Sequence, residues 1–127
     1  MSANDPAADP GSGEAPRAVV VLLTGPTADT LRAIGGSLVA ERLAACVNVL
    51  PGVRSIYRWQ GAVEESEEAL AIVKTTADRL PDLEARVGEL HPYELPEILA
   101  IEPDGGSTTY LNWIRESVTT RSGDGAA

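Results

Sequence analysis

Two side chains able to bind a soft metal ion each occur once: Cys46 is the only cysteine and His91 the only histidine. Thiolate and imidazole are common ligands of copper and zinc, so these two residues are the candidate metal ligands. Cys46 is also typical of a small buried apolar residue, and His91 of a polar helix end. One cysteine cannot build a complete thiolate site in a subunit. We therefore expect weak binding of copper or another divalent cation, and no required cofactor.

Four other side chains are candidates for holding a small molecule: Trp59, Lys74, Tyr93 and Glu94. Lys74 ends an apolar run and is suited either to an anionic ligand or to a structural pair with Glu41 or another carboxylate. Trp59 is suited either to packing at an interface or to stacking on a ligand. Tyr93 and Glu94 follow the histidine and are expected at the same end of the fold.

Motifs of the common enzyme classes do not occur in the sequence, which lacks Walker and Rossmann glycine patterns, CxxC and HExxH. The acidic run 64–68 resembles a cation site, but alternation on a strand sends neighbouring carboxylates to opposite faces. We interpret this run as a solvated surface and expect a protein without catalytic residues.

The overall charge excludes some partners. The 127 residues carry a formal net charge of −9, whereas binding to nucleic acid or to anionic membranes needs clustered basic residues. A single cysteine leaves no intrachain disulfide, so a reducing compartment is expected. The first 16 residues lack a basic start and an apolar stretch, so no secretory signal is predicted. These features favour a cytoplasmic protein that binds neither nucleic acid nor membrane.

The chain divides into a folded part, 17–118, between a disordered tail at 1–16 and a flexible tail at 119–127, both poor in apolar residues. Apolar spacing predicts strands at 18–23, 45–59, 63–75 and 98–101, and helices up to about 43, from 78 to 90, and after 107. Pro51-Gly52 predicts a bulge, and Gly35-Gly36 predicts close packing of the first helix on the sheet.

This βαββαβ order with a further C-terminal helix predicts an α+β, ferredoxin-like sandwich. Alternating chain direction places Cys46 at one end of the sheet and His91 at the other. A Cys–His nucleophilic pair needs hydrogen-bond contact, so none is expected within one subunit.

The second strand is too long for one domain. Its 15 residues from 45 to 59 extend about 50 Å at 3.3 Å per residue, whereas the first helix covers about half that length. The hairpin would carry Tyr57, Trp59 and bare strand edges into solvent, which proteins avoid. Another copy of the chain is the simplest cover.

Five segments resemble the CutA family of divalent-cation-tolerance proteins, in order and spacing: 41–48 (ERLAACVN), 57–59 (YRW), 72–76 (IVKTT), 91–98 (HPYELPEI) and 110–114 (YLNWI). The resemblance implies a ferredoxin-like subunit in a homotrimer whose hairpins pack on neighbouring subunits. It also implies a role in the response to copper and other divalent cations. The similar architecture of trimeric PII signalling proteins implies an alternative, an adaptor that binds a small anionic ligand between subunits.

Overall fold

The computed structural model describes residues 15–120. Its elements follow the predicted β-α-β-β-α-β order, with a helix added at the end. They are β2 (Ala18–Gly25), α1 (Ala28–Ala40), β3 (Cys46–Trp59), β4 (Ala62–Thr76), the 3₁₀ helix η2 (Ala77–Arg79), α2 (Leu80–Leu90), β5 (Ile98–Ile101) and α3 (Thr108–Val118). The predicted tails, 1–16 and 119–127, lie almost entirely outside the described residues.

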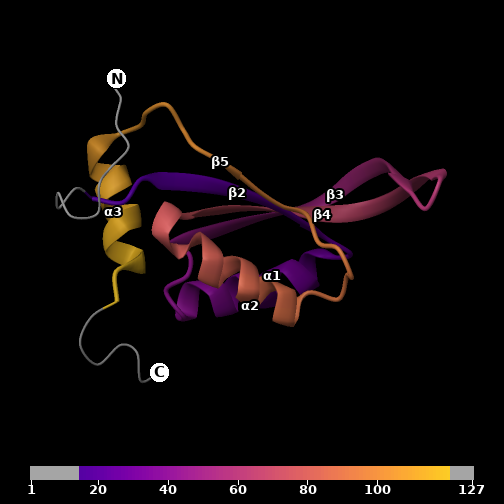
Figure 1. The fold of residues 1–127 in the computed structure, drawn as a ribbon, viewed down its shortest axis with the longest axis horizontal. Coiled ribbons are helices and arrows are strands. Elements are labelled where there is room, and N and C mark those ends of the chain that lie inside the picture. The colour runs from indigo at the N-terminus through magenta and orange to yellow at the C-terminus, as the bar shows by residue number, and fades with distance from the viewer. Residues whose placement is uncertain (1–14, 121–127) are drawn as a thin grey trace.

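The four strands form one antiparallel sheet in the order β3-β4-β2-β5. Helices α1 and α2 cover one face of it, and α3 lies across the end opposite the hairpin (Figure 1). Alternate residues of β2 and β4 point toward α1 and α2, since side chains on a strand alternate between faces. The resulting core contains Val19, Val21, Leu23, Ala71 and Val73 from the sheet and Leu31, Ile34, Leu38, Leu83 and Val87 from the helices.

The opposite face of the sheet is apolar and open. The unbroken apolar sequence of β2 is typical of a strand that is buried on both faces. In the structure Val20 and Leu22 are only half-buried, so this face of β2 is not fully covered by the described chain. The strand pairing places apolar residues of β4 and β5 beside Val20 and Leu22 on the same face. On this face the side chains of Leu50, Leu99 and Ile101 are 42%, 56% and 47% exposed. We call this surface the open sheet face; its apolar members are Val20, Leu22, Leu50, Leu70, Ile72, Leu99 and Ile101.

The β3–β4 hairpin extends past the sheet, as predicted. Residues 69–76 of β4 pair with β2, whereas the outer part of β4 pairs with β3 alone. The projection is plain in Figure 1, where the hairpin reaches beyond both covering helices. A register shift between Leu50 and Val53 confirms the bulge at Pro51-Gly52. The tip is a two-residue turn in which Gln60 and Gly61 both have positive φ, the geometry that fits a twisted hairpin.

Helix α1 ends three residues before the position predicted near Leu43. Arg42 adopts φ 60°, and the Leu43 amide donates to the Leu38 carbonyl at 2.8 Å while the Arg42 amide donates to Val39 at 3.1 Å. These two bonds form a Schellman motif, which ends a helix. Glycine usually occupies the left-handed position of this motif. Because Arg42 occupies it here, the sequence did not indicate the end of the helix.

Helix α2 begins at Leu80, after the 3₁₀ helix η2, two residues later than predicted, and Pro81 lies in its first turn, where proline is tolerated. The Ser107 hydroxyl accepts a hydrogen bond from the Tyr110 amide and caps α3. Gly35 is packed on the sheet, because a Cβ there would lie 3.0 Å from Val47 Cγ1, but Gly36 has open space. No helix within 15–120 is long and apolar enough to cross a membrane.

Candidate functional site

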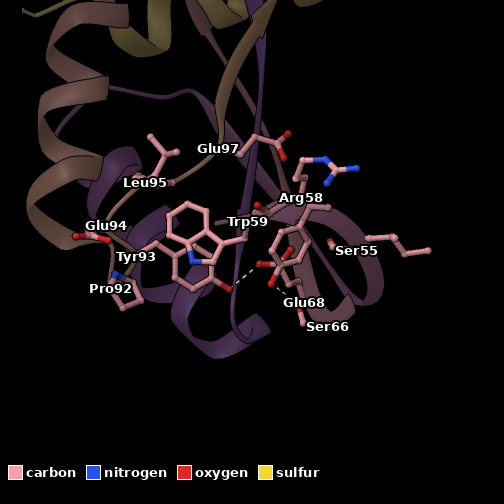
Figure 2. Close-up of a pocket in the computed structure, with 14 residues that line it drawn as sticks. Ser55, Arg58, Trp59, Ser66, Glu68, Pro92, Tyr93, Glu94, Leu95 and Glu97 are labelled. Atoms are coloured by element: carbon pink, nitrogen blue, oxygen red, sulfur yellow. Dashed lines mark hydrogen bonds between the residues drawn. The ribbon is translucent and has the colours of Figure 1, made fainter. Parts of the chain in front are cut away.

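An open groove of about 930 Å³ lies between the hairpin and the loop that joins α2 to β5 (Figure 2). Strand β3 contributes 55–59 to it, β4 contributes Ser66 and Glu68, and the loop contributes 92–97. The groove exists because the hairpin overshoots the sheet while Pro92 and Pro96 hold the loop outside α2 and β5. Its volume is in the range of small-molecule sites.

His91 ends α2 and fixes the start of this loop. The residue is only 7% exposed, and its Nε2 lies 2.7 Å from the Thr24 carbonyl oxygen. The Tyr93 amide donates to Nδ1 at 3.1 Å. Since Nδ1 accepts, Nε2 carries the ring proton and donates to Thr24. Both nitrogens of His91 are therefore used inside the chain, and the ring lies 4.8 Å from that of Tyr93.

Tyr93 continues this chain of hydrogen bonds across the groove. Its hydroxyl donates to Glu68 Oε2 at 2.6 Å (Figure 2). Burial raises the pKa of the phenol above its usual value near 10, and the bond to Glu68 raises it further. Tyr93 is therefore a neutral donor at neutral pH. It holds one oxygen of the Glu68 carboxylate in place and leaves the other, Oε1, free to accept.

Aromatic and charged side chains line the rest of the groove. Tyr57 and Trp59 are 41% and 39% exposed, and the Tyr57 hydroxyl lies 3.3 Å from Ser66 Oγ. Glu94, Glu97 and the guanidinium of Arg58 also line it. None of these last three side chains has an ion pair or hydrogen bond with another residue in the described part of the chain.

The second group of predicted residues lies at the other end of the sheet. Cys46 pairs with Lys74 across β3 and β4, and the Cys46 thiol lies 3.7 Å from Asn48 Oδ1. The Lys74 ammonium donates to that same oxygen. Lys74 therefore pairs with Asn48, and the expectation of Glu41 is wrong because Glu41 binds Arg86 at 2.9 Å instead. All three side chains lie on the open sheet face, since they occupy paired or alternate positions.

Cys46 and His91 do not meet within one chain. His91 contacts Thr24, which pairs with Leu70, whereas Cys46 pairs with Lys74 four residues further along β4. Four residues of strand span about 13 Å. Residues 15–120 contain no group of three or more His, Cys, Asp or Glu placed to hold a metal ion. The donors within residues 15–120 of one chain thus do not fit a closed metal site.

The groove brings together three of the predicted ligand-binding residues, Trp59, Tyr93 and Glu94, and leaves out Lys74. The sequence argument missed Glu68, which was grouped with the solvated acidic run. Its position directly before the buried Ala69 was the available signal, because a carboxylate at the edge of a core usually has a partner. Glu64, Glu65 and Glu67 are exposed, as expected for that run.

Three comparisons with known proteins agree. The family model described as "CutA1 divalent ion tolerance protein" matches residues 19–117. The divalent-cation tolerance protein CutA of Thermus thermophilus is 53% identical over 98 residues, covering 77% of this chain and 95% of that protein. Human protein CutA is 40% identical over 112 residues, covering 87% of this chain and 63% of its own length. The solved Thermus thermophilus structure superposes with a TM-score of 0.79 at 51% identity, covering 80% and 99% of the two chains. CutA1 of Oryza sativa gives 0.80 at 36% identity, covering 84% and 98%.

Proposed function

The chain belongs to the CutA1 divalent ion tolerance family, and from this premise we propose a non-enzymatic role in the response to and tolerance of divalent metal ions. The working form in this proposal is a homotrimer of ferredoxin-like subunits. The observation that carries it is the open sheet face, which places apolar side chains and Cys46 on one uncovered surface.

Assembly is supported by two features of the described chain. The open sheet face exposes large side chains such as Leu50 and Leu99, and contiguous apolar surface of this kind marks an interaction site. The outer edge of β3 has no strand beside it over 14 residues. Bare edges of this length pair with other chains unless they are covered. A ring of three copies would cover both features.

Metal contact in this proposal is weak and uses Cys46. A copper(I) ion prefers thiolates, and one subunit supplies one of them on the open sheet face. Three subunits would supply three. His91 is a weaker candidate, because each of its ring nitrogens already has a partner. The nearby Lys74 ammonium also opposes tight binding of a cation by Cys46.

A competition titration of the purified protein with a chromophoric copper(I) chelator tests this part. Cys46→Ser should weaken binding by about tenfold or more, since it removes the soft ligand. His91→Ala should change the affinity by less than about twofold if both ring nitrogens are already engaged. Equal affinities for the wild type and Cys46→Ser would contradict the proposal.

A second candidate function is a PII-like adaptor that binds a small ligand. It is favoured by the groove, which gathers Trp59, Tyr93 and Glu94 in one cavity of ligand size. The candidate cation Lys74 lies outside the groove, so Arg58 is the cation that an anionic ligand would meet there. A thermal-shift screen of metabolites tests this function, since a ligand that binds the folded protein raises its Tm.

The cytoplasmic location stays a prediction from the single cysteine and from the composition of the first 16 residues. Its relatives include a protein of Arabidopsis thaliana described as chloroplastic and one of Archaeoglobus fulgidus described as periplasmic.

A further inference from the structure

We propose that the stacked aromatic pair on α3, Tyr110 and Trp113, is the surface on which a neighbouring copy of the chain docks its β3–β4 hairpin. On the hairpin, Ile56 and Val63 make this contact. The inference deepens the proposed homotrimer and rests on it, because it names two patches that meet between copies.

The aromatic pair lies beside the residues that hold α3 to the sheet. Its inward side packs on the end of the sheet through Leu111, Ile114 and Val118. Tyr110 and Trp113 are not part of this buried cluster, and each is 43% exposed. Their rings stack with centroids 5.5 Å apart and planes inclined by 25°. Because each ring restricts the other, ordering the pair on binding costs little conformational entropy. Tyrosine and tryptophan are also among the residues that dominate interface energies.

The hairpin presents a second apolar patch that its own chain leaves bare. Ile56 and Val63 are 69% and 67% exposed. Val63 pairs with Arg58, two residues from Ile56, so Ile56 and Val63 are diagonal neighbours on one side of the hairpin. Tyr57 and Trp59 occupy the alternate positions of β3, so both sides of the projecting hairpin carry apolar side chains. A hairpin of this kind needs contact with another chain.

The symmetry of a trimer decides which surfaces meet. Three copies in a closed ring share a heterologous contact, in which one surface of a copy meets a different surface of the next. The hairpin and α3 lie at opposite ends of the sheet (Figure 1). Head-to-tail closure therefore brings the hairpin of one copy to the α3 end of the next. A hairpin that docked on a second hairpin would instead form a twofold dimer.

The distribution of exposed apolar side chains indicates the same partner surface. Within residues 15–120, the large exposed apolar side chains lie on the open sheet face, at the hairpin and its neighbouring loop, on α3, and at Val39 of α1. Val39 is a single residue on the helical layer, and the open sheet face lies between the two ends of the molecule. The Tyr110–Trp113 pair is thus the apolar patch at the end that a neighbouring hairpin meets.

Photo-crosslinking locates the contact. In the variant Trp113→p-benzoylphenylalanine, irradiation should join position 113 to residues 53–63 of another copy. In trimers that mix isotope-labelled and unlabelled subunits, the mass of the adduct shows whether its two peptides come from different copies. The control is Val39→p-benzoylphenylalanine, because Val39 is also 43% exposed but lies on α1. It should give no adduct with residues 53–63.

Subunit exchange between labelled and unlabelled trimers, followed by native mass spectrometry, measures the strength of the contact. Trp113→Ala should speed the exchange by at least about tenfold, since truncation of an interface aromatic mainly raises the dissociation rate. Val63→Ala, on the exposed hairpin, should also speed it. The double variant should show less than the product of the two effects, because both residues act in one contact. Val39→Ala should leave the exchange rate unchanged.

Three results would overturn the inference and leave the trimer in place. The first is an adduct of position 113 that falls outside residues 53–63 or within its own copy. The second is an equal exchange rate for Trp113→Ala and Val39→Ala. The third is a double variant whose effect equals the product of the single effects, because the two patches would then act independently. A monomer would instead refute the proposed assembly, and the docking with it.

Discussion

Breaking the bond between Tyr93 and Glu68 should cost measurable stability, because it links the α2–β5 loop to β4. The donor–acceptor distance is 2.6 Å and the acceptor is a carboxylate. Hydrogen bonds to charged groups contribute about 1.5–3 kcal/mol, and an open groove reduces this, so we expect a coupling energy of about 1–2 kcal/mol. The coupling is measured by a double-mutant cycle with Tyr93→Phe, Glu68→Ala and the double variant.

Urea unfolding at neutral pH and one fixed protein concentration provides the free energies, since the stability of an oligomer depends on concentration. The control cycle is Tyr57→Phe with Ser66→Ala, a neutral pair in the same groove with a longer distance of 3.3 Å. Its coupling should stay below about 0.5 kcal/mol, as for an exposed neutral bond. A Tyr93–Glu68 coupling no larger than that of the control would refute the proposed structural link.

Three further predictions concern helix packing, ionisation and capping. Gly35→Ala should lower the stability by about 1–2 kcal/mol, because the added Cβ would lie 3.0 Å from Val47, whereas Gly36→Ala should raise it by about 0.5–1 kcal/mol. Both changes are measured from the midpoints of urea unfolding. A gain in stability for Gly35→Ala would contradict the close packing on the sheet. An alkaline absorbance titration should show an ionisation above pH 10 that Tyr93→Phe abolishes. Because folding raises the pKa of the Tyr93 phenol, the stability that the neutral phenol contributes is complete below pH 10 and is lost as the pH rises further. Ser107→Ala should cost about 1 kcal/mol through loss of the α3 cap, and an unchanged Tm would argue against that cap.

Much of the fold could be predicted from local pattern. The apolar pattern, together with the turn-forming Gly and Pro residues, predicted the ends of each strand to within two residues. It does so because one face of the sheet must be buried against helices. The bulge at Pro51-Gly52 follows from two residues that disfavour a regular strand at that position. The length of 45–59 alone predicted a hairpin that overshoots the sheet.

The missed features depend on contacts between distant segments. The Schellman motif uses Arg42 where glycine is usual, so its sequence looks like continuing helix. Glu68 resembles its exposed neighbours until the α2–β5 loop brings Tyr93 against it. Lys74 was grouped with the ligand-binding residues by its charge, although strand register pairs it with Cys46. Such pairings are set by tertiary structure and have no local signature.

Native mass spectrometry of the purified protein, with and without added copper and zinc, tests the proposed function most directly. We expect a trimer, because the open sheet face and the β3 edge both need cover. That trimer should retain a whole number of copper ions and lose them in Cys46→Ser. A monomer would contradict the proposed assembly, and a trimer that retains no specific ion would contradict the proposed metal contact.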